Sequence, residues 1–398
     1  MNAPKIGVVI PTYAGGISVD KAIESVRTAG REAKKTLSVV LVDNHPESVD
    51  RIYSDLADHY ISLPHNPGFG AACNAGISLL IHNMDFDFVF LLNPDAYIDS
   101  NFFMNLQEYL EKQTEKVTWP IMPLISYDYK VHRIDLDALF NEFHELVTII
   151  DLDDDFVVFE QHGSSVNSED PLRKRVYFTD FLVLRHDRAV PKEIFFFRNS
   201  EQSLESLRIT ESHLIEDQLV QNAGSYLSSP FSAGDRNMGW LASASSSSLG
   251  GQREAWCGAA VLLPRDYIIS LKGFDETFFL YYEDTEFSLR GWKVGIFPQL
   301  VTQLRVTHQH SGITGQYPKL RQKEIWKSQF IFSSRKNGVV PTFALFCYKV
   351  LRYTSILLRG KTTFRHFAKF FLPEISFNFL GLVKSLKVRP ANRYLRAK

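Results

Sequence analysis

The chain has few cysteines and no long uninterrupted apolar run. Its three cysteines, Cys73, Cys257 and Cys347, lie far apart among 398 residues and form no CxxC pair, so the sequence predicts neither a disulfide framework nor a zinc knuckle. No stretch reaches the roughly 18 apolar residues of a membrane-spanning helix. No basic and apolar regions of a secretion signal precede the apolar residues 6–10. We therefore expect a globular, cytoplasmic protein.

Negative charge is almost absent from residues 339–398. This segment holds twelve Lys and Arg but one acid, Glu374, although the net charge of the whole chain is −1. It is also rich in Phe, Leu and Tyr. The combination favours amphipathic helices on an anionic membrane surface, and not a nucleic-acid partner. The alternative is a helical cap packed on the core, with its basic residues in water.

Buried strands and helices are expected to alternate in the first hundred residues. Apolar runs at 6–10, 37–42 and 86–92 read as strands, and residues 20–35 and 68–82 read as helices. This alternation predicts an α/β fold with a mostly parallel sheet, whose ligands bind beyond the carboxyl ends of the strands. Three polar segments follow the strands, the first with a proline expected to end its strand: Pro11-Thr12-Tyr13, Asp43-Asn44 and Asn93-Pro94-Asp95.

Two widely separated carboxylate sites point to chemistry. Asp95 follows one apolar run, and Glu283-Asp284 follow the aromatic residues 278–282. One site could hold a metal while the other activates a nucleophile. Gly68 and Gly70 loosely match a dinucleotide fingerprint, but Cys73 stands where its third glycine belongs, so a dehydrogenase is disfavoured. Backbone N–H groups at the start of this helix could still face a pyrophosphate.

Six short motifs in order resemble glycosyltransferase family 2, and most closely its bacterial rhamnosyltransferase-like branch. They are Ile10-Pro11-Thr12-Tyr13, Val42-Asp43-Asn44, Asn66-Pro67-Gly68-Phe69-Gly70 with Asn74 and Gly76, Asn93-Pro94-Asp95, Trp256-Cys257-Gly258-Ala259-Ala260, and Gly273-Phe274-Asp275 leading to Glu283-Asp284. The resemblance implies a GT-A nucleotide-diphospho-sugar transferase fold and an inverting sugar transfer.

The resemblance also implies roles on the donor side. Asp43 would hydrogen-bond the pyrimidine base, and its neighbours at the strand ends would line the donor pocket. Asp43, Thr12 and Tyr13 have a plainer alternative as a turn or cap at the end of a strand. Asn74 could hold the donor or equally be a local cap in the first turn of its helix. The donor-binding set is Pro11, Thr12, Tyr13, Asp43, Asn44, Gly68, Asn74, Asn93 and Asp95.

The same resemblance implies which residues bind the metal and which residue acts as the catalytic base. Asp95 matches the last acid of the family's DxD-type motif and would bind Mg or Mn, although Asn93 replaces the first acid. A histidine, His308 or His310, could complete the shell. Asp284 matches the catalytic base, and Glu283 is the competing candidate. The acceptor side would include Trp256, Gly258 and Tyr282. The aromatic residues 278–282 before the base could stack on a sugar ring or pack in the core.

Four segments are expected: a nucleotide-sugar half at 1–124, an insertion at 125–253 with a Ser- and Gly-rich loop at 223–252, a catalytic-base half at 254–338, and an amphipathic tail at 339–398. The donor is expected to be dTDP-rhamnose, with UDP-sugars next. The acceptor would be a glycan or a lipid-linked oligosaccharide, at the inner face of the plasma membrane. The alternatives are a non-catalytic sugar-nucleotide or glycan binder and a membrane-associated scaffold. A processive synthase is disfavoured because no Gln-x-x-Arg-Trp motif is present.

Overall fold

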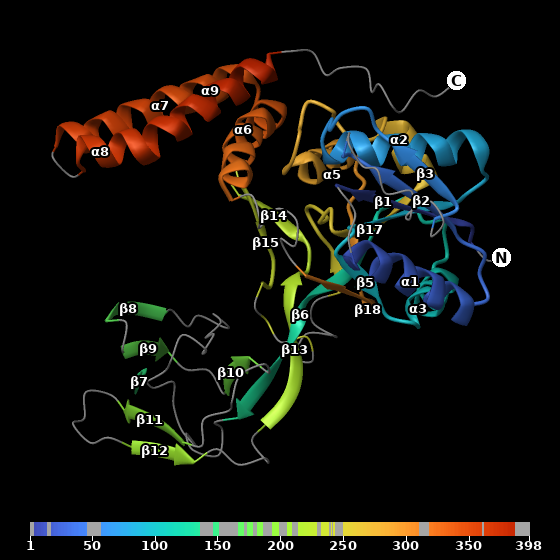
Figure 1. Cartoon of the computed structure of the whole chain (residues 1–398), viewed down its shortest axis with the longest axis horizontal. Coiled ribbons are helices and arrows are strands. Elements are labelled where there is room, and N and C mark those ends of the chain that lie inside the picture. Colours follow the sequence, from blue (N-terminus) through green and yellow to red (C-terminus); the bar gives the residue numbers. More distant parts are fainter. Residues whose placement is uncertain are drawn as a thin grey trace. The chain divides into compact units, whose positions relative to one another are not determined.

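The computed structural model in Figure 1 contains two compact units. The first comprises Met1–Leu124, Ala223–Arg236 and Gly250–Lys398, and the second comprises Ile125–Asn222 and Asn237–Leu249. The structure describes residues 4–13, 17–45, 57–135, 146–150, 166–170, 173–177, 181–185, 193–198, 205–208, 214–228, 232–238, 240, 242, 250–309, 318–359 and 362–386.

A mixed sheet forms the centre of the first unit. Its parallel part has the order β4-β1-β2-β3, and β17 joins β4 in the antiparallel direction. Every residue of β1, β2 and β4 is buried, as expected for strands covered on both faces. The bounds are β1 (Ile6–Thr12), β2 (Ser38–Asp43), β3 (His59–Ser62), β4 (Phe88–Leu92) and β17 (Ala260–Pro264). This confirms the expected α/β architecture.

The sheet continues beyond β17 through β6, β18 and β16, and the short strand β5 pairs with β18. These strands are β6 (Ile121–Asp135), β18 (Gln299–His308), β16 (Gly251–Gln252) and β5 (Ala96–Ile98). The pairing of β5 with β18 is antiparallel and sets His308 opposite Ala96. It therefore brings a segment from far along the chain to the turn that follows β4.

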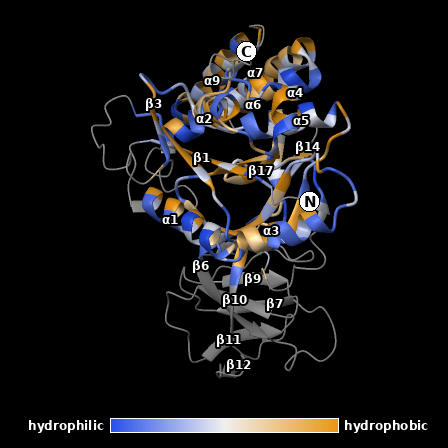
Figure 2. Cartoon of the chain, turned by 90° about the vertical axis from the view of Figure 1, so that its right-hand side faces the viewer, coloured by the Kyte–Doolittle hydropathy of each residue, from blue (hydrophilic) through white to orange (hydrophobic). Residues whose placement is uncertain are grey.

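Helices cover both faces of this sheet. Helix α2 (Phe69–Asn83) packs on β1 and β2, while α1 (Ile17–Glu32) and α3 (Phe102–Glu111) lie on the opposite face (Figure 2). The approach of α2 is close: a Cβ added to Gly76 would lie 2.6 Å from a methyl group of Val9. A glycine is therefore required where the helix crosses the sheet.

Pro11 does not end the first strand, contrary to expectation. It lies within β1 opposite Val42, and the pairing continues to Thr12 and Asp43. On the other side of β1, however, pairing with β4 stops at Val9. At Pro11 the strand is therefore an edge on one side, where a residue without an N–H group is tolerated.

The C-terminal region is helical, as expected. Helix α5 (Glu283–Trp292) follows α4 (Arg265–Leu271), and α6 (Pro318–Asn337) packs mainly on α9 (Leu372–Ser385). Between them lie α7 (Val339–Leu358), α8 (Phe364–His366) and the π-helical turn η5 (Phe367–Phe371). Phe278, Leu289, Ile331 and Phe332 form a buried cluster joining α5 to α6. No helix among the described residues is long and apolar enough to cross a membrane.

The second unit is built from antiparallel strands. Five of them form a sheet in the order β12-β11-β7-β9-β8, and β10 and β13 pair with β6. The bounds are β7 (Leu146–Ile150), β8 (Val166–Asp170), β9 (Arg173–Tyr177), β10 (Phe181–Arg185), β11 (Glu193–Arg198), β12 (Glu205–Arg208) and β13 (Leu214–Asn222).

The expected Ser- and Gly-rich loop contains a hairpin instead. Strands β14 (Ser225–Ser228) and β15 (Ser232–Asp235) pair with each other. The hairpin belongs to the first unit, in which Glu254 accepts hydrogen bonds from the Leu227 N–H at 2.5 Å and from Arg236 at 3.0 Å. Residues 243–249 lie outside the described residues.

Candidate active site

Three of the expected donor segments meet at one edge of the sheet. Strands β4, β1 and β2 are adjacent and parallel, so the segments after them lie at the same end. There the Thr12 Oγ1, Asn44 Oδ1 and Asn93 Oδ1 atoms are buried without a hydrogen-bond partner. A buried polar atom without a partner is costly, and it is typical of a site that binds a ligand. The structure therefore brings together the parts of a polar site.

Asp43 closes a turn at the end of β2. Its two carboxylate oxygens accept hydrogen bonds from the His45 N–H at 2.8 Å and from the Tyr60 hydroxyl at 3.1 Å. The ring of Tyr13 meets that of His45 edge-on, with centroids 4.9 Å apart. The structure thus contains the turn that was the plainer reading of Asp43, and its contact with a base stays a prediction.

The loop before α2 is fastened to the segment before α5. Gly68 has a φ of 104°, and a Cβ added there would lie 2.3 Å from the Phe279 carbonyl oxygen. That carbonyl accepts a hydrogen bond from the Phe69 N–H at 2.9 Å, while the Gly68 N–H donates to Asn66 Oδ1 at 3.0 Å. The N–H groups of Gly68 and Phe69 are therefore engaged within the protein. The expectation that the N–H groups at the helix start face a pyrophosphate is corrected for these two and otherwise stays a prediction.

Asn74 of α2 also connects this helix to the segment before α5. It is fully buried, and its Nδ2 donates to the Phe274 carbonyl at 3.1 Å and to Glu276 at 2.9 Å. Its Oδ1 accepts the Phe274 N–H at 2.9 Å. All three contacts are to residues 274–276, so Asn74 has no exposed surface for a ligand. The expected donor contact is corrected to a positioning contact between α2 and the catalytic-base half.

Asp95 and His308 lie side by side in the turn after β4. The Asp95 Oδ1 and His308 Nε2 atoms are 3.0 Å apart, and Asn93 Nδ2 is 3.4 Å from the same nitrogen. Asp95 is 8% exposed and His308 is 6% exposed. The antiparallel pairing of β5 with β18 causes this approach. His308 is therefore the histidine that reaches Asp95, and His310 lies outside the described residues.

The residues of this turn fit a divalent cation. Among the described residues, no group of three His, Cys, Asp or Glu side chains could hold a metal by itself. Asp95 and His308 nevertheless offer one carboxylate and one imidazole, and the buried Asn93 Oδ1 lacks a hydrogen-bond partner. A mixed set of oxygen and nitrogen donors suits Mn, and the oxygens also suit Mg. The remaining ligands would have to come from the donor's phosphates and water.

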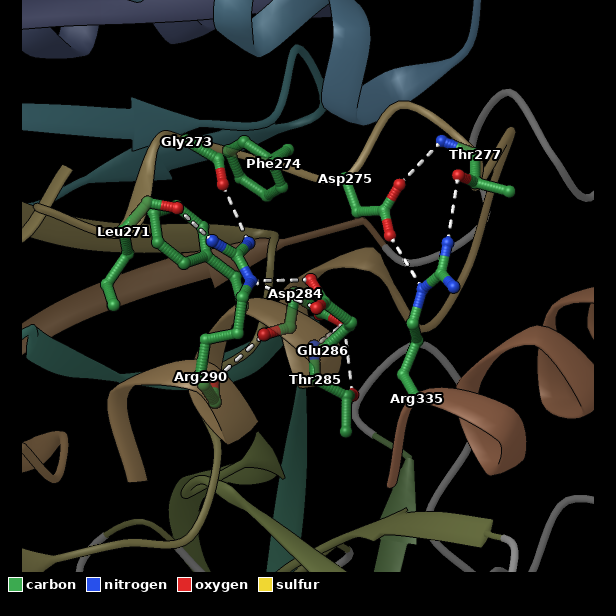
Figure 3. Close-up of polar contacts among 12 residues, drawn as sticks. Leu271, Gly273, Phe274, Asp275, Thr277, Asp284, Thr285, Glu286, Arg290 and Arg335 are labelled. Atoms are coloured by element: carbon green, nitrogen blue, oxygen red, sulfur yellow. Dashed lines mark hydrogen bonds and ion pairs between the residues drawn. The ribbon is translucent and has the colours of Figure 1, made fainter. Parts of the chain in front are cut away.

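Asp284 lies at the start of α5 and is held by its neighbours (Figure 3). Its Oδ2 accepts the Gly258 N–H at 2.8 Å, and its Oδ1 accepts the Thr285 N–H at 2.6 Å and the Thr285 hydroxyl at 3.1 Å. Burial raises the pKa of Asp284 above its usual value, and these hydrogen bonds only partly offset it. A carboxylate fixed in place with a raised pKa suits a general base.

Glu283 occupies a different environment. It is 5% exposed, its Oε2 is buried without a partner, and burial together with the charge of Asp284 raises its pKa to about 8. This raised pKa favours the protonated form of Glu283 near neutral pH. Tyr281 and Tyr282, just before α5, have φ values of 67° and 69°. Such backbone strain in bulky residues is typical of functional sites.

Two consecutive residues connect this base to the turn that carries Asp95. The Ala259 carbonyl accepts the Asn93 N–H at 2.9 Å, and the Gly258 N–H binds Asp284. Both contacts come from the segment that leads into β17, which pairs with β4. The carboxylate at the start of α5 and the turn after β4 are thus fixed to one backbone segment.

The three residues expected on the acceptor side lie in different surroundings. Trp256 is fully buried and its ring packs against Phe274 and Phe287, with centroids 5.8 Å away in both cases. It is a core residue, which corrects the expectation that it contacts an acceptor. Gly258 is also buried and contributes its N–H to Asp284. Tyr282 packs on Phe332 with ring centroids 5.3 Å apart.

Two arginines that the sequence did not single out position the segment before the base (Figure 3). Arg290 donates to the carbonyls of Leu271 and Gly273 while pairing with Glu286. Arg335 of α6 pairs with the fully buried Asp275 at 3.0 Å and also contacts Thr277 and the Ser385 carbonyl. The Gly273-Phe274-Asp275 motif marks one end of this contact, but no local pattern marks an arginine sixty residues later.

Replacing Arg335 with Ala is expected to destabilise the protein by about 3–5 kcal/mol, because it leaves the Asp275 carboxylate buried without its cation. Adding Asp275→Asn should recover part of this loss. Urea unfolding of the two single variants and the double variant measures the coupling. Lys319→Ala, an exposed change on the same helix, is the control and should cost under about 0.5 kcal/mol. Additive losses would contradict the proposed pairing.

Part of the chain matches the model of a known protein family. The family model described as Glycosyl transferase family 2 matches residues 7–174. Among solved structures, the chain is similar to GalNAc-T7 crystallised with UDP, GalNAc and Mn2+, at 12% identity and a TM-score of 0.39, covering 77% of this chain and 44% of that one. It is similar to S. aureus TarS at 10% identity and a TM-score of 0.39, covering 83% and 39%. No curated protein sequence matches it.

A further similar structure is S. aureus TarS 1-349 in complex with UDP, at 10% identity and a TM-score of 0.38, covering 83% of this chain and 65% of that one. The chain thus spans less than two thirds of each of these proteins. The mixed sheet and helices form a GT-A fold, and residues 7–174 are similar to glycosyltransferase family 2. The rhamnosyltransferase-like branch stays a prediction.

Proposed function

We propose that this protein is an inverting, metal-dependent glycosyltransferase. It transfers a sugar from a nucleoside-diphosphate donor to a hydroxyl group of a glycan or lipid-linked oligosaccharide. The proposal rests on one observation: the catalytic base and the donor turn are held by consecutive residues. The Gly258 N–H donates to Asp284, and the carbonyl of the next residue, Ala259, accepts from the Asn93 N–H. Because both groups are attached to one backbone segment, the base and the donor turn keep a fixed position relative to each other. A single displacement between two bound substrates needs such fixed positions.

Asp284 takes the proton of the acceptor hydroxyl. The acceptor oxygen then forms a bond to the anomeric carbon, while the bond from that carbon to the donor's phosphate oxygen breaks and its electron pair leaves with the nucleoside diphosphate. One displacement inverts the anomeric configuration. A divalent cation bound by Asp95, His308 and Asn93 would offset the charge of the departing diphosphate. Glu283, protonated, keeps a second negative charge away from Asp284.

On the donor side, we propose dTDP-rhamnose first and UDP-linked sugars second, on the resemblance of the Asn93-Pro94-Asp95 turn to the rhamnosyltransferase-like branch. The Tyr13 and His45 rings, beside Asp43, are proposed to receive the pyrimidine nucleoside. The acceptor would belong to bacterial surface polysaccharide assembly, such as O-antigen synthesis. This places the enzyme at the inner face of the plasma membrane.

Incubation with dTDP-, UDP- and GDP-sugars, with and without Mn or Mg, tests the proposal. We expect metal-dependent release of nucleoside diphosphate from one donor, and transfer when a glycan or lipid-linked acceptor is added. Proton NMR of the product should show inversion of the anomeric configuration. Retention would overturn the mechanism. Donor binding without turnover, even with acceptors present, would favour a non-catalytic binder.

A further inference from the structure

The last helix presents its apolar side to solvent. On α9 and at its end, every exposed residue except Ser376 is apolar. The exposed apolar residues recur with helical spacing, so they share one face. They are Leu372, Phe379, Leu380, Val383 and Leu386, with exposures of 50%, 49%, 46%, 41% and 61%. In a helix at a water-facing surface these positions would carry polar residues.

The opposite side of α9 carries the polar groups and faces the protein. Glu374 accepts hydrogen bonds from Lys349 and from the Tyr353 hydroxyl of α7, each at 2.9 Å. Asn378 is fully buried, and Ser385 is 4% exposed. A Cβ added to Gly381 would lie 2.2 Å from the Lys327 carbonyl oxygen of α6, so this face is tightly packed. The amphipathic pattern is therefore reversed, with polar groups inside and apolar groups outside.

Helix α7, which runs beside α9 in Figure 1, repeats this pattern. Val340, Leu351 and Leu358 lie on one side of it, with exposures of 80%, 69% and 81%. The connection between the two helices adds exposed Phe364 and Phe370, at 75% and 47%. We call these exposed apolar residues of α7, the connection and α9 the C-terminal apolar face.

Positive charge accompanies this face. Arg352, Arg359, Arg365 and Lys369 are exposed on α7 and on the connection to α9. Glu374, the single acid of residues 339–398, is engaged by Lys349 and Tyr353 between α9 and α7. A surface of exposed apolar side chains with exposed cations fits an anionic lipid surface, into which the apolar groups insert while the cations meet the headgroups.

A second copy of the chain would bind the C-terminal apolar face less favourably than an anionic lipid surface does. Its corresponding face carries the same excess of Lys and Arg, so pairing two such faces would bring like charges together in an apolar contact. We propose that the C-terminal apolar face docks the protein on an anionic lipid bilayer without crossing it. Docking on lipid does not depend on the reaction proposed above, because the C-terminal apolar face contains neither Asp95 nor Asp284.

Vesicle co-sedimentation tests the proposal with the full-length protein. We expect binding to vesicles of phosphatidylethanolamine and phosphatidylglycerol, little binding to phosphatidylcholine vesicles, and weakening in high salt. Leu380→Ser with Val383→Ser should lower the vesicle partition constant at least about tenfold, since two apolar side chains that would insert into the bilayer are lost. The matched control is Ile269→Ser with Val294→Ser, two exposed apolar residues elsewhere, which should leave binding unchanged.

Circular dichroism of each variant checks that the helices remain. Light scattering behind a sizing column measures the mass of the protein in solution. Equal loss of binding in the control pair, absence of binding to anionic vesicles, or a dimer that dissociates in Leu380→Ser with Val383→Ser would each overturn the proposal. Donor hydrolysis in solution should be unchanged in these variants, which separates failure of lipid docking from failure of the proposed reaction.

Discussion

Asp284→Asn is expected to lower sugar transfer about a thousandfold, whereas Glu283→Gln should retain most of it. General-base catalysis typically contributes about 10²–10⁴-fold. Asparagine keeps the size of Asp284 and a hydrogen-bond acceptor for the Gly258 N–H, but it cannot take a proton. Glutamine imitates the protonated form in which Glu283 already exists at neutral pH. Initial rates with saturating donor and acceptor measure the contrast.

Donor affinity provides the control for this pair of variants. Both changes are isosteric, so the dissociation constant of the nucleoside diphosphate should change less than about threefold, or about 0.6 kcal/mol. If Glu283→Gln abolished transfer while Asp284→Asn remained active, the two roles would be exchanged. If both variants stayed active, the base would lie elsewhere and the proposed mechanism would be wrong.

Glu283 should also make stability depend on pH. Its pKa is raised from 4.5 to about 8 in the folded protein, so between these values the folded state holds a proton that the unfolded state has lost. Stability therefore falls as pH rises from about 4.5 to about 8, by on the order of a few kcal/mol. Glu283→Gln should flatten this fall. Urea unfolding of both proteins across the interval measures it, and identical slopes would contradict the raised pKa.

Local patterns predicted the parts of the site that depend on strand ends. The apolar runs before Asp43 and Asn93 identify buried strands, and adjacency of parallel strands then brings their ends together. The start of α5 at Glu283 was likewise readable, because acids follow an aromatic stretch there. The burial that separates the pKa values of Glu283 and Asp284 was not, since it depends on packing around both side chains.

Contacts between distant segments could not be read in this way. Asn74 reads locally as a cap, yet its amide serves residues 274–276. The choice between His308 and His310 required the register of β18 against β5, which no local pattern gives. Trp256 is the first residue of a motif and was expected on the acceptor side, but its ring packs in the core against Phe274 and Phe287. In each case tertiary packing decided what the local sequence could not.

Asp95→Ala is expected to lower transfer about a hundredfold or more and to weaken Mn binding at least about tenfold. The change removes the carboxylate of a turn whose other donors are His308 and the buried Asn93 Oδ1. A cation held by one carboxylate fewer loses the strongest electrostatic attraction of the site. Titration of Mn followed by electron paramagnetic resonance, in the presence of a nucleoside diphosphate, measures binding independently of turnover.

His308→Ala should weaken Mn binding less than Asp95→Ala, because a neutral imidazole supplies one ligand but no charge. Asp99→Ala is the matched control: this exposed aspartate lies four residues beyond Asp95, just after β5, and its loss should leave the Mn titration unchanged. Unchanged Mn binding in both Asp95→Ala and His308→Ala would exclude the turn as the metal site. Loss in His308→Ala alone would instead indicate a nitrogen-dominated site, in which Asp95 only orients the imidazole through the 3.0 Å contact.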